Sequence, residues 1–206
     1  MSLAGVSYKD FWKIENDMDA HLKVMGALLE KNVDCFNAHQ AANFILNEIR
    51  YPNELECLEI GAGYGRVMKA IKPFIKSVVG VDVSEDLIRR SGGEPIVLTD
   101  GEHLPFTDSS FDLVYSYLCF QHMPNIRIVR QNLSEVYRVL CSGGVFKGQF
   151  IQGDAIDYGE DNRYGNGRNF PSALDLQEEF KMLEFSDIEV RLGISHPQHT
   201  WVTARK

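Results

Sequence analysis

The chain has 206 residues, of which 44% are hydrophobic and 24% charged, and its formal net charge is −8. This length suits one globular domain with a substantial core. The negative charge disfavours a protein that grips nucleic-acid phosphates, so we do not expect nucleic acid as a partner. No apolar run reaches the length of a membrane span, and the N-terminus lacks a signal peptide's hydrophobic stretch. We therefore expect a cytoplasmic protein that contacts no membrane.

Two amphipathic patterns come first along the chain. Apolar residues from Phe11 to Leu29 recur every three or four positions, which predicts a helix with one apolar stripe. A second pattern runs from Ala38 to Ile49, and the Tyr51-Pro52-Asn53 segment is expected to end it. We interpret residues 1–52 as a helical extension whose stripes pack on the rest of the domain in preference to binding a partner.

A strand, a glycine turn and a helix follow directly. The apolar run from Leu55 to Ile60 predicts a buried strand of a parallel sheet. Gly61, Gly63 and Gly65 come next, and helical spacing resumes at Val67. Such a turn lets the backbone approach a ligand closely and directs the free N–H groups of a helix start at it.

The remaining elements alternate between strands and helices. Their expected positions are strands at 77–81, 95–99, 111–116, 145–151, 188–192 and 200–204, with helices after Ser84, after Asn125 and from Pro171. The Ser142-Gly143-Gly144 segment is expected to cap the helix that starts after Asn125. The last two strands are joined by a link too short for a parallel crossover, so they should be antiparallel neighbours. The pattern thus predicts an α/β sheet with one reversed strand near its C-terminal edge.

Polar residues mark the carboxyl ends of four expected strands. Glu59 closes the first, Asp82 the second, Asp100 the third and Ser116 the fourth. In an open α/β sheet the ligand lies beyond these ends, where the strand order reverses. Asp82 lies 82 − 65 = 17 residues after Gly65, about where a ribose-binding acid is expected. The alternative for Asp82 alone is an ordinary turn residue before a helix.

Five segments in this order resemble class I S-adenosylmethionine-dependent methyltransferases, in particular the broad small-molecule group. The segments are Leu58-Glu59-Ile60-Gly61-Ala62-Gly63-Tyr64-Gly65, Val79-Gly80-Val81-Asp82-Val83-Ser84, Asp100-Gly101-Glu102-His103-Leu104-Pro105-Phe106, Ser110-Phe111-Asp112-Leu113-Val114 and Tyr137-Arg138-Val139-Leu140-Cys141-Ser142-Gly143-Gly144. The resemblance implies a Rossmann-like doubly wound sheet of about seven strands, mostly parallel, with one antiparallel strand near the C-terminal edge and N-terminal helices. It also implies one domain, 1–206, with its cofactor-binding core at 53–151 and a C-terminal helix and strands at 171–206.

The resemblance further implies a role for each matching position. The methionine moiety of S-adenosyl-L-methionine would lie against Glu59 and the turn formed by Gly61, Ala62, Gly63 and Gly65. Asp82 would take the ribose hydroxyls and Val83 would pack on the adenine. Asp100 would accept from the adenine amino group, with the backbone N–H of Gly101 or Glu102 donating to the ring. Ser116 and Tyr117 would line the wall beside the sulfonium, a group that the three acids suit electrostatically.

Two residues are candidates for catalysis. His122, just past the fourth strand, is a candidate general base, with a structural histidine as the equal alternative. Tyr117 is the second candidate. Neither His196 nor His199 has a cysteine or acid at ligand spacing, so no metal site is expected. Cys35, Cys57, Cys119 and Cys141 contain no C-x-x-C pair, which is typical of free thiols in a reducing compartment.

The acceptor is expected to be a small molecule. Residues 152–170 are rich in Gly, Asp and Asn, and we expect them to act with 8–12 as a lid or, equally, to be an ordinary surface loop. Tyr158, Tyr164 and Phe170 would line the acceptor pocket. The acidic balance of 152–170 favours a compact, neutral or weakly cationic acceptor.

Three rival functions need weighing. An NAD-dependent oxidoreductase is disfavoured because Arg66 occupies the place of the third glycine in the dinucleotide fingerprint. An RNA methyltransferase is disfavoured by the net charge. A cofactor-binding regulatory or partner protein without catalysis stays open, because methyl transfer requires no fixed catalytic residue.

Overall fold

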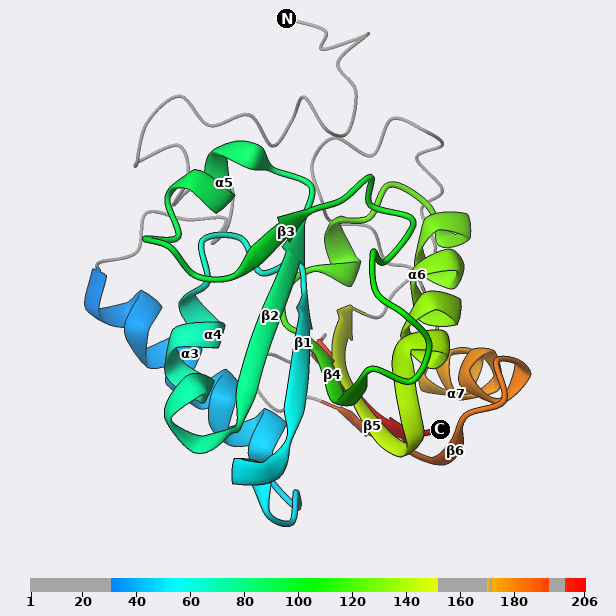
Figure 1. Cartoon of the computed structure of the whole chain (residues 1–206). Helices are drawn as coiled ribbons and strands as arrows, with labels where there is room; N and C mark the ends of the chain where they lie inside the picture. Colours follow the sequence, from blue (N-terminus) through cyan, green and yellow to red (C-terminus); the bar gives the residue numbers. More distant parts are fainter. Residues whose placement is uncertain (1–30, 152–169, 171, 193–198) are drawn as a thin grey trace, which may run out of the picture.

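The computed structural model describes residues 31–151, 170, 172–192 and 199–206, which form one seven-stranded sheet flanked by helices (Figure 1). The strand order is β3-β2-β1-β4-β5-β7-β6. The strands are β1 Glu56–Ile60, β2 Ser77–Asp82, β3 Ile96–Leu98, β4 Phe111–Ser116, β5 Leu140–Ile151, β6 Ser186–Leu192 and β7 His199–Arg205. Strand β7 is antiparallel to β5 and β6, whereas the pairs from β3 to β5 are parallel. The expected sheet, with one reversed strand near its C-terminal edge, is confirmed.

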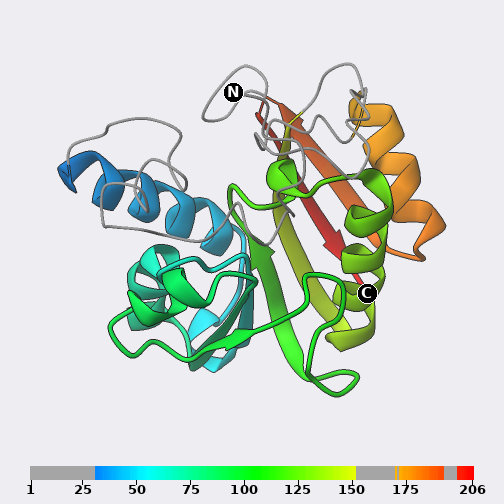
Figure 2. The ribbon, with the colours of Figure 1, turned by 90° about the horizontal axis from the view of Figure 1, so that it is seen from above.

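Helices cover both faces of the sheet (Figure 2). Helices α3 (Lys31–Leu46) and α4 (Arg66–Ile71) pack on one face, and α6 (Ile126–Val139) and α7 (Ala173–Met182) pack on the other. The shorter helices are η1 Pro52–Glu54, η2 Lys72–Phe74, α5 Glu85–Arg89 and η3 Phe120–His122. Because side chains alternate along a strand, Phe146 and Phe150 of β5 pack toward α7, whereas Val145 packs on the α3 and α4 side.

Helix α3 ends earlier than its sequence pattern indicates. Four of its residues are buried against the sheet: Ala38, Ala41, Ala42 and Ile45. The helix stops at Leu46, not at the expected segment 51–53. Glu48 has a left-handed backbone, with φ 63°, which turns the chain out of the helix. At this helix end the buried Lys147 ammonium of β5 donates to the carbonyls of Phe44 and Asn47. Carbonyls at a helix end lack partners within the helix, so this lysine caps α3 and fixes it to the sheet.

The expected glycine cap of α6 is wrong. Helix α6 ends at Val139, and Leu140 is already extended and pairs with Phe111 of β4. The Ser142-Gly143-Gly144 segment instead belongs to an irregular start of β5, where the register shifts. Gly143 N–H donates to the Lys206 carbonyl at 2.9 Å and Lys206 N–H to Gly144 at 3.1 Å. The glycines therefore serve pairing with the C-terminus of the chain.

The strand order reverses beside β1. From β1 the chain proceeds through β2 to β3 on one side, and then crosses to β4 and β5 on the other. Connections that leave a strand in opposite directions open a crevice at the carboxyl ends of the two central strands. The crevice here lies beyond Ile60 and Ser116, next to the glycine turn.

Several expectations fall on other parts of the chain. The predicted helix at 11–29 and the lid segment at 152–169 lie outside the described residues, as does His196. Phe170 is described, and it packs in the aromatic core with its ring centroid 5.8 Å from that of Phe150. None of the helices that the structure describes is long and apolar enough to cross a bilayer.

The N-terminal cap of α6 provides a test of the fold. Asn125 accepts a hydrogen bond from the Ile128 backbone N–H at 3.0 Å through its side-chain oxygen. Asn125→Ala removes this acceptor and should lower the free energy of unfolding by about 1 kcal/mol in urea denaturation. Asn125→Asp keeps the oxygen and should unfold near the wild-type midpoint. An alanine variant as stable as the wild type would contradict the cap.

Candidate functional site

The glycine turn between β1 and α4 is built from three residues in the left-handed region. Gly61, Gly63 and Gly65 have φ values of 71°, 57° and 79°. A side chain is disfavoured at such angles. Space adds a second constraint at Gly61, because a Cβ atom there would collide with the Cys119 side chain. The turn therefore requires glycine for both its path and its packing.

Asp82 ties this turn to the end of β2. Its Oδ2 accepts from the Gly63 N–H at 2.7 Å, and its Oδ1 accepts from the Ser84 N–H at 2.8 Å. Ser84 in turn caps α5 by accepting from the Leu87 N–H at 3.3 Å. Burial raises the pKa of Asp82, and the backbone donors oppose that shift. The Asp82 carboxylate thus connects the glycine turn, the end of β2 and the start of α5.

Glu59 is the second acid of the site and lies at the end of β1. Its side chain is only 2% exposed, and Tyr115 donates its hydroxyl proton to Oε2 at 3.1 Å. Burial raises the pKa of Glu59 to about 8, against the effect of the tyrosine donor. The Arg66 charge and the Met68 backbone also favour the ionised form, but the cost of burial exceeds all of these contributions. A cation in the adjoining pocket would supply the missing compensation.

An aromatic column supports the opposite wall. The Arg66 guanidinium lies over the Tyr117 ring at 5.3 Å from its centroid, and Tyr117 stacks on Trp201 at 5.8 Å. Trp201 in turn contacts Phe44 of α3, with ring centroids 4.2 Å apart. Cation–π contact and stacking hold the Tyr117 ring in place. Helix α3 is thereby connected to the site through the rings of Trp201 and Tyr117.

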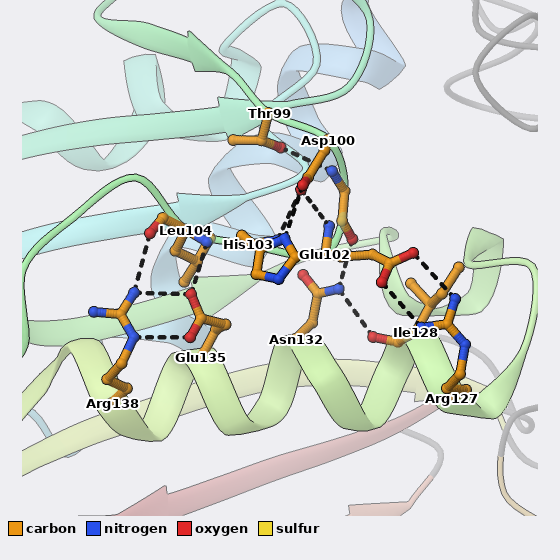
Figure 3. Close-up of polar contacts among 11 residues, drawn as sticks. Thr99, Asp100, Glu102, His103, Leu104, Arg127, Ile128, Asn132, Glu135 and Arg138 are labelled. Carbon is orange, nitrogen blue, oxygen red and sulfur yellow. Dashed lines mark hydrogen bonds and ion pairs between the residues drawn. The ribbon is translucent and has the colours of Figure 1, made fainter.

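The loop after β3 is fastened to α6 (Figure 3). Glu102 forms a two-point pair with Arg127, at 2.9 and 3.1 Å. The Leu104 N–H donates to Glu135 at 2.9 Å. Arg138 donates to the carbonyl of Leu104 at 3.0 Å and also binds Glu135. Side chains of one helix thus determine the path of a loop about 30 residues away in sequence.

Asp100 is occupied within the same loop. Its Oδ1 accepts from the N–H groups of Glu102 and His103, each at 2.8 Å, and its Oδ2 lies 2.8 Å from His103 Nδ1. The hydrogen bond to His103 is the main cause that lowers the pKa of Asp100 to about 2, and the same contact raises the pKa of His103. This carboxylate, half of whose surface is exposed, organises the turn.

The segment after β4 closes the site. Leu118 has a left-handed backbone, with φ 56°, and its N–H donates to the Gln149 side-chain oxygen at 3.1 Å. His122 is half-buried, with Nε2 3.2 Å from the Gln121 amide nitrogen. Burial raises the pKa of Cys119 to about 12, so its thiol stays protonated and unreactive. Bulky residues with positive φ are costly and cluster at functional sites.

These groups enclose one pocket of about 910 Å³, counting the open space at its mouth. The predicted residues in its wall are Glu59, Gly61, Ala62, Gly63, Asp82, Val83, Gly101, Tyr117 and His122. Gly65, Asp100, Glu102 and Ser116 are not in the wall. Ser116 instead donates its buried hydroxyl to the Ile60 carbonyl at 3.0 Å and thereby links β4 to β1.

Sequence reasoning missed several other wall residues. They include Leu87, Leu104, Met123, Ile128 and Asn132. Leu104 lies in one of the five segments that carry the family resemblance, so the sequence could have indicated it. For Ile128 and Asn132 of α6, the sequence offers only the helical spacing of their neighbours. Arg66 is the sole lysine or arginine in the described wall. No group of three or more His, Cys, Asp or Glu side chains in the described parts of the chain can hold a metal ion.

The wall fits a cationic, aromatic cofactor. Glu59 and Asp82 both line the pocket, and burial raises the pKa of each. A positively charged ligand beside them would favour their ionised forms. Val83, Leu87 and Leu104 supply apolar surface for a flat ring. The glycine turn permits close approach of a polar chain.

Comparisons with known proteins agree with this reading. Residues 58–147 match a family model described as a methyltransferase domain. A sterol 4-C-methyltransferase of Caenorhabditis elegans is 32% identical over 155 residues, which cover 68% of this chain and 42% of that protein. The uncharacterized protein MJ1123 of Methanocaldococcus jannaschii is 32% identical over 164 residues, covering 69% of this chain and 75% of that one.

A solved structure extends the match to the fold. A SAM-dependent methyltransferase of Thermotoga maritima aligns with a TM-score of 0.60 and 22% identity, over 84% of this chain and 92% of that one. Residues 58–147 thus match the methyltransferase domain family, and the fold is that of solved SAM-dependent methyltransferases. The chain spans less than half the length of the nematode enzyme, so nothing about that enzyme's acceptor transfers directly.

The acid at the end of β1 makes stability depend on pH. The folded-state pKa of Glu59 lies near 8, above its ordinary value of 4.5. Its stabilising contribution is therefore full below about pH 4.5 and is lost as pH rises toward 8. Glu59→Gln cannot ionise, so its stability relative to the wild type should rise over this interval, by up to about 1.4 kcal/mol per pH unit. Urea denaturation of the ligand-free proteins at pH 5 and pH 7.5 measures this difference, and parallel profiles would refute it.

Proposed function

We propose that this protein transfers a methyl group from S-adenosyl-L-methionine to a small-molecule acceptor. The observation that carries the proposal is a pair of acids, the buried Glu59 and the half-buried Asp82, beside a glycine turn at the strand-order reversal. Membership of the methyltransferase family supports the reaction type.

Each part of the wall has a counterpart in the cofactor. Glu59 and the turn around Gly61 and Gly63 would hold the methionine end, whose ammonium compensates the buried acid. Each Asp82 oxygen already accepts one backbone N–H, which leaves lone pairs for both ribose hydroxyls. Val83 would pack on the adenine.

The same geometry disfavours a nicotinamide dinucleotide. A pyrophosphate needs several free N–H groups and a neutral or positive surface at the glycine turn. Here the Gly63 N–H is taken by Asp82, and Glu59 adds a second acid close by. A doubly charged anion at this place would face two carboxylates.

The reaction needs positioning more than activation. The cofactor supplies a methyl group on a sulfonium, which leaves readily in an in-line displacement. The protein's contribution is to hold the acceptor in line and to remove a proton where the nucleophile carries one. The Tyr117 ring, fixed between Arg66 and Trp201, would form the positioning wall. His122 is the proposed general base.

The residues of the pocket wall around His122 indicate which kind of acceptor molecule would fit. Around His122 it is formed by Tyr117, Leu118 and Met123, and its single cationic side chain, Arg66, is engaged with an aromatic ring. A polyanion such as RNA would find no basic surface there, whereas a compact, partly apolar molecule would find matching contacts.

Removing the acid at the end of β2 tests the cofactor site. Asp82→Ala leaves the ribose hydroxyls and the Gly63 N–H without an acceptor, so binding of S-adenosyl-L-methionine in calorimetry should weaken by roughly 1–3 kcal/mol. Asp86→Ala, a change of the same kind at an α5 residue outside the pocket wall, is the matched control and should bind as the wild type does. Tight binding of NAD with no response to the methyl donor would refute the assignment.

Replacing the proposed base tests catalysis separately from binding. His122→Ala should lower the methyl-transfer rate on a panel of small acceptors by roughly 10²–10⁴-fold while cofactor affinity stays almost unchanged. The control is His39→Ala, which changes an exposed histidine of α3 outside the pocket. Normal turnover by the His122 variant would leave this residue a structural role. No turnover by the wild type would favour a non-catalytic binding protein, and preference for tRNA would overturn the acceptor class.

A further inference from the structure

Tyr115 is a buried phenol that lies outside the pocket but contacts one of its acids. It belongs to β4, is 0% exposed and is absent from the described pocket wall. Its hydroxyl donates to Oε2 of Glu59 at 3.1 Å, and Glu59 is a wall residue. The hydrogen bond therefore connects the core of the sheet to the site.

The parallel pairing of β1 with β4 sets this contact. Glu59 and Tyr115 lie opposite each other in the register, so their side chains leave the sheet on the same face. On that face Tyr115 belongs to the buried cluster beneath α3 and α4, which also contains Leu113, Val145 and Trp201. A ring packed among core side chains has little freedom to move. The hydroxyl consequently reaches Glu59 from a fixed direction.

Packing alone does not require this pair. Phenylalanine would supply the same ring as Tyr115 without a hydroxyl to bury, and an apolar residue in place of Glu59 would remove the buried acid. Replacing both partners of a buried hydrogen bond by apolar groups of similar shape is nearly neutral or stabilising. The core therefore gains little from the pair, whereas a pocket that must hold an acid gains a donor for it.

The phenol acts on the ionisation of Glu59 as well as on its position. A hydrogen bond to a charged carboxylate is stronger than one to a neutral acid, so Tyr115 favours the ionised form. Burial is the largest influence and raises the pKa of Glu59 to about 8, and the Asp82 charge adds to the rise. The Arg66 charge and the Met68 backbone oppose the rise together with the phenol. At neutral pH the ligand-free acid is thus largely protonated, and a bound ammonium group would ionise it.

The other titratable groups on this face differ in their behaviour between pH 7 and 9. Burial raises the pKa of Cys57 and of Cys119 to about 12, so both thiols stay neutral. Burial also raises the pKa of Tyr115, whose hydroxyl keeps its proton. Lys147 lies opposite Tyr115 on β5, and burial lowers its pKa to about 8. An experiment on Glu59 must therefore separate its titration from that of Lys147.

We propose that Tyr115 is a positioning residue of the cofactor site, whose hydroxyl holds the Glu59 carboxylate in place and favours its charged form for the ammonium group at the methionine end of the cofactor. The inference rests on the proposed cofactor site. Tyr115 acts through Glu59 and is not itself part of the pocket wall. Because the ammonium group favours the ionised acid, binding is coupled to the proton that Glu59 gives up.

Calorimetry of the full chain with S-adenosylhomocysteine at pH 7 and pH 9 tests the proposal. Tyr115→Phe removes one oxygen and keeps the ring, so Glu59 becomes harder to ionise. The variant should bind roughly 10-fold more weakly than the wild type at pH 7. This ratio should shrink severalfold at pH 9, because the higher pH ionises Glu59 in both proteins. Comparing the proteins at the same pH cancels the titration of the ligand. Tyr137→Phe, which changes a tyrosine outside the pocket wall, is the control and should bind as the wild type does at both pH values.

A second background separates Glu59 from Lys147. Glu59→Gln has no proton to lose, so adding Tyr115→Phe to it should change the affinity by the same small factor at both pH values. A pH-dependent ratio that persists in this background belongs to Lys147 and overturns the inference. A Tyr115→Phe variant with wild-type affinity, or one weakened equally at pH 7 and pH 9, also overturns it. The cofactor site stands in each of these cases, whereas a wild type that does not bind S-adenosylhomocysteine overturns the site and the inference together.

A measurement on proteins that keep Tyr115 decides the matter if Tyr115→Phe does not fold. Binding heats at pH 7 in two buffers of different ionisation enthalpy give the number of protons released. The wild type should release roughly one proton more per bound ligand than Glu59→Gln does. Equal proton release by the two proteins would overturn the inference.

Discussion

The carboxylate of Asp82 is the contact on which the site depends most. It accepts from Gly63 on the turn after β1 and from Ser84 at the start of α5, so it links two crossovers of the sheet at the point where the strand order reverses. The turn needs this link because three of its residues adopt left-handed angles that offer no regular hydrogen-bonding pattern. A residue that shapes the site is also well placed to bind the ligand. The two roles reinforce each other, because fixing a carboxylate in advance reduces the entropy lost on binding.

Helix α6 is the second organising element. Arg127, Asn132, Glu135 and Arg138 lie along the side of the helix that faces the loop after β3, and they bind this loop (Figure 3). The loop carries little regular structure of its own, so its path depends on these contacts. Exposed ion pairs contribute little individually, but the bonds from Asn132 and Glu135 to backbone groups are shielded and specify geometry. The far side of α6 is apolar and packs on the sheet, which connects the loop's position to the core.

Local signals predicted much of this arrangement. The glycines after β1, the acid at the end of β2 and the side-chain caps at Ser84 and Asn125 each depend on neighbours a few residues away, and the structure has them as expected. The mostly parallel sheet followed from the alternation of strands and helices, and its reversed strand from the short link between the last two strands.

The features that escaped prediction are contacts between distant segments. Lys147 caps α3 from about 100 residues away, and Asn132 binds Gly101 across 31 positions. The sequence near each residue carries no sign of its partner. Asp100 shows the converse, because the matching motif gave no sign of the hydrogen bonds that its oxygens accept within their own turn. Glycines also misled at residues 143 and 144, where pairing with the C-terminus competes with helix capping.

The most direct test of the account is a crystal structure of the chain with S-adenosylhomocysteine. The account predicts that the ligand lies in the pocket at the strand-order reversal, with its ribose at Asp82 and its amino-acid end near Glu59. Ligand bound elsewhere would contradict it, for instance in the second cavity at the opposite end of the sheet, which Arg50 and Arg205 line.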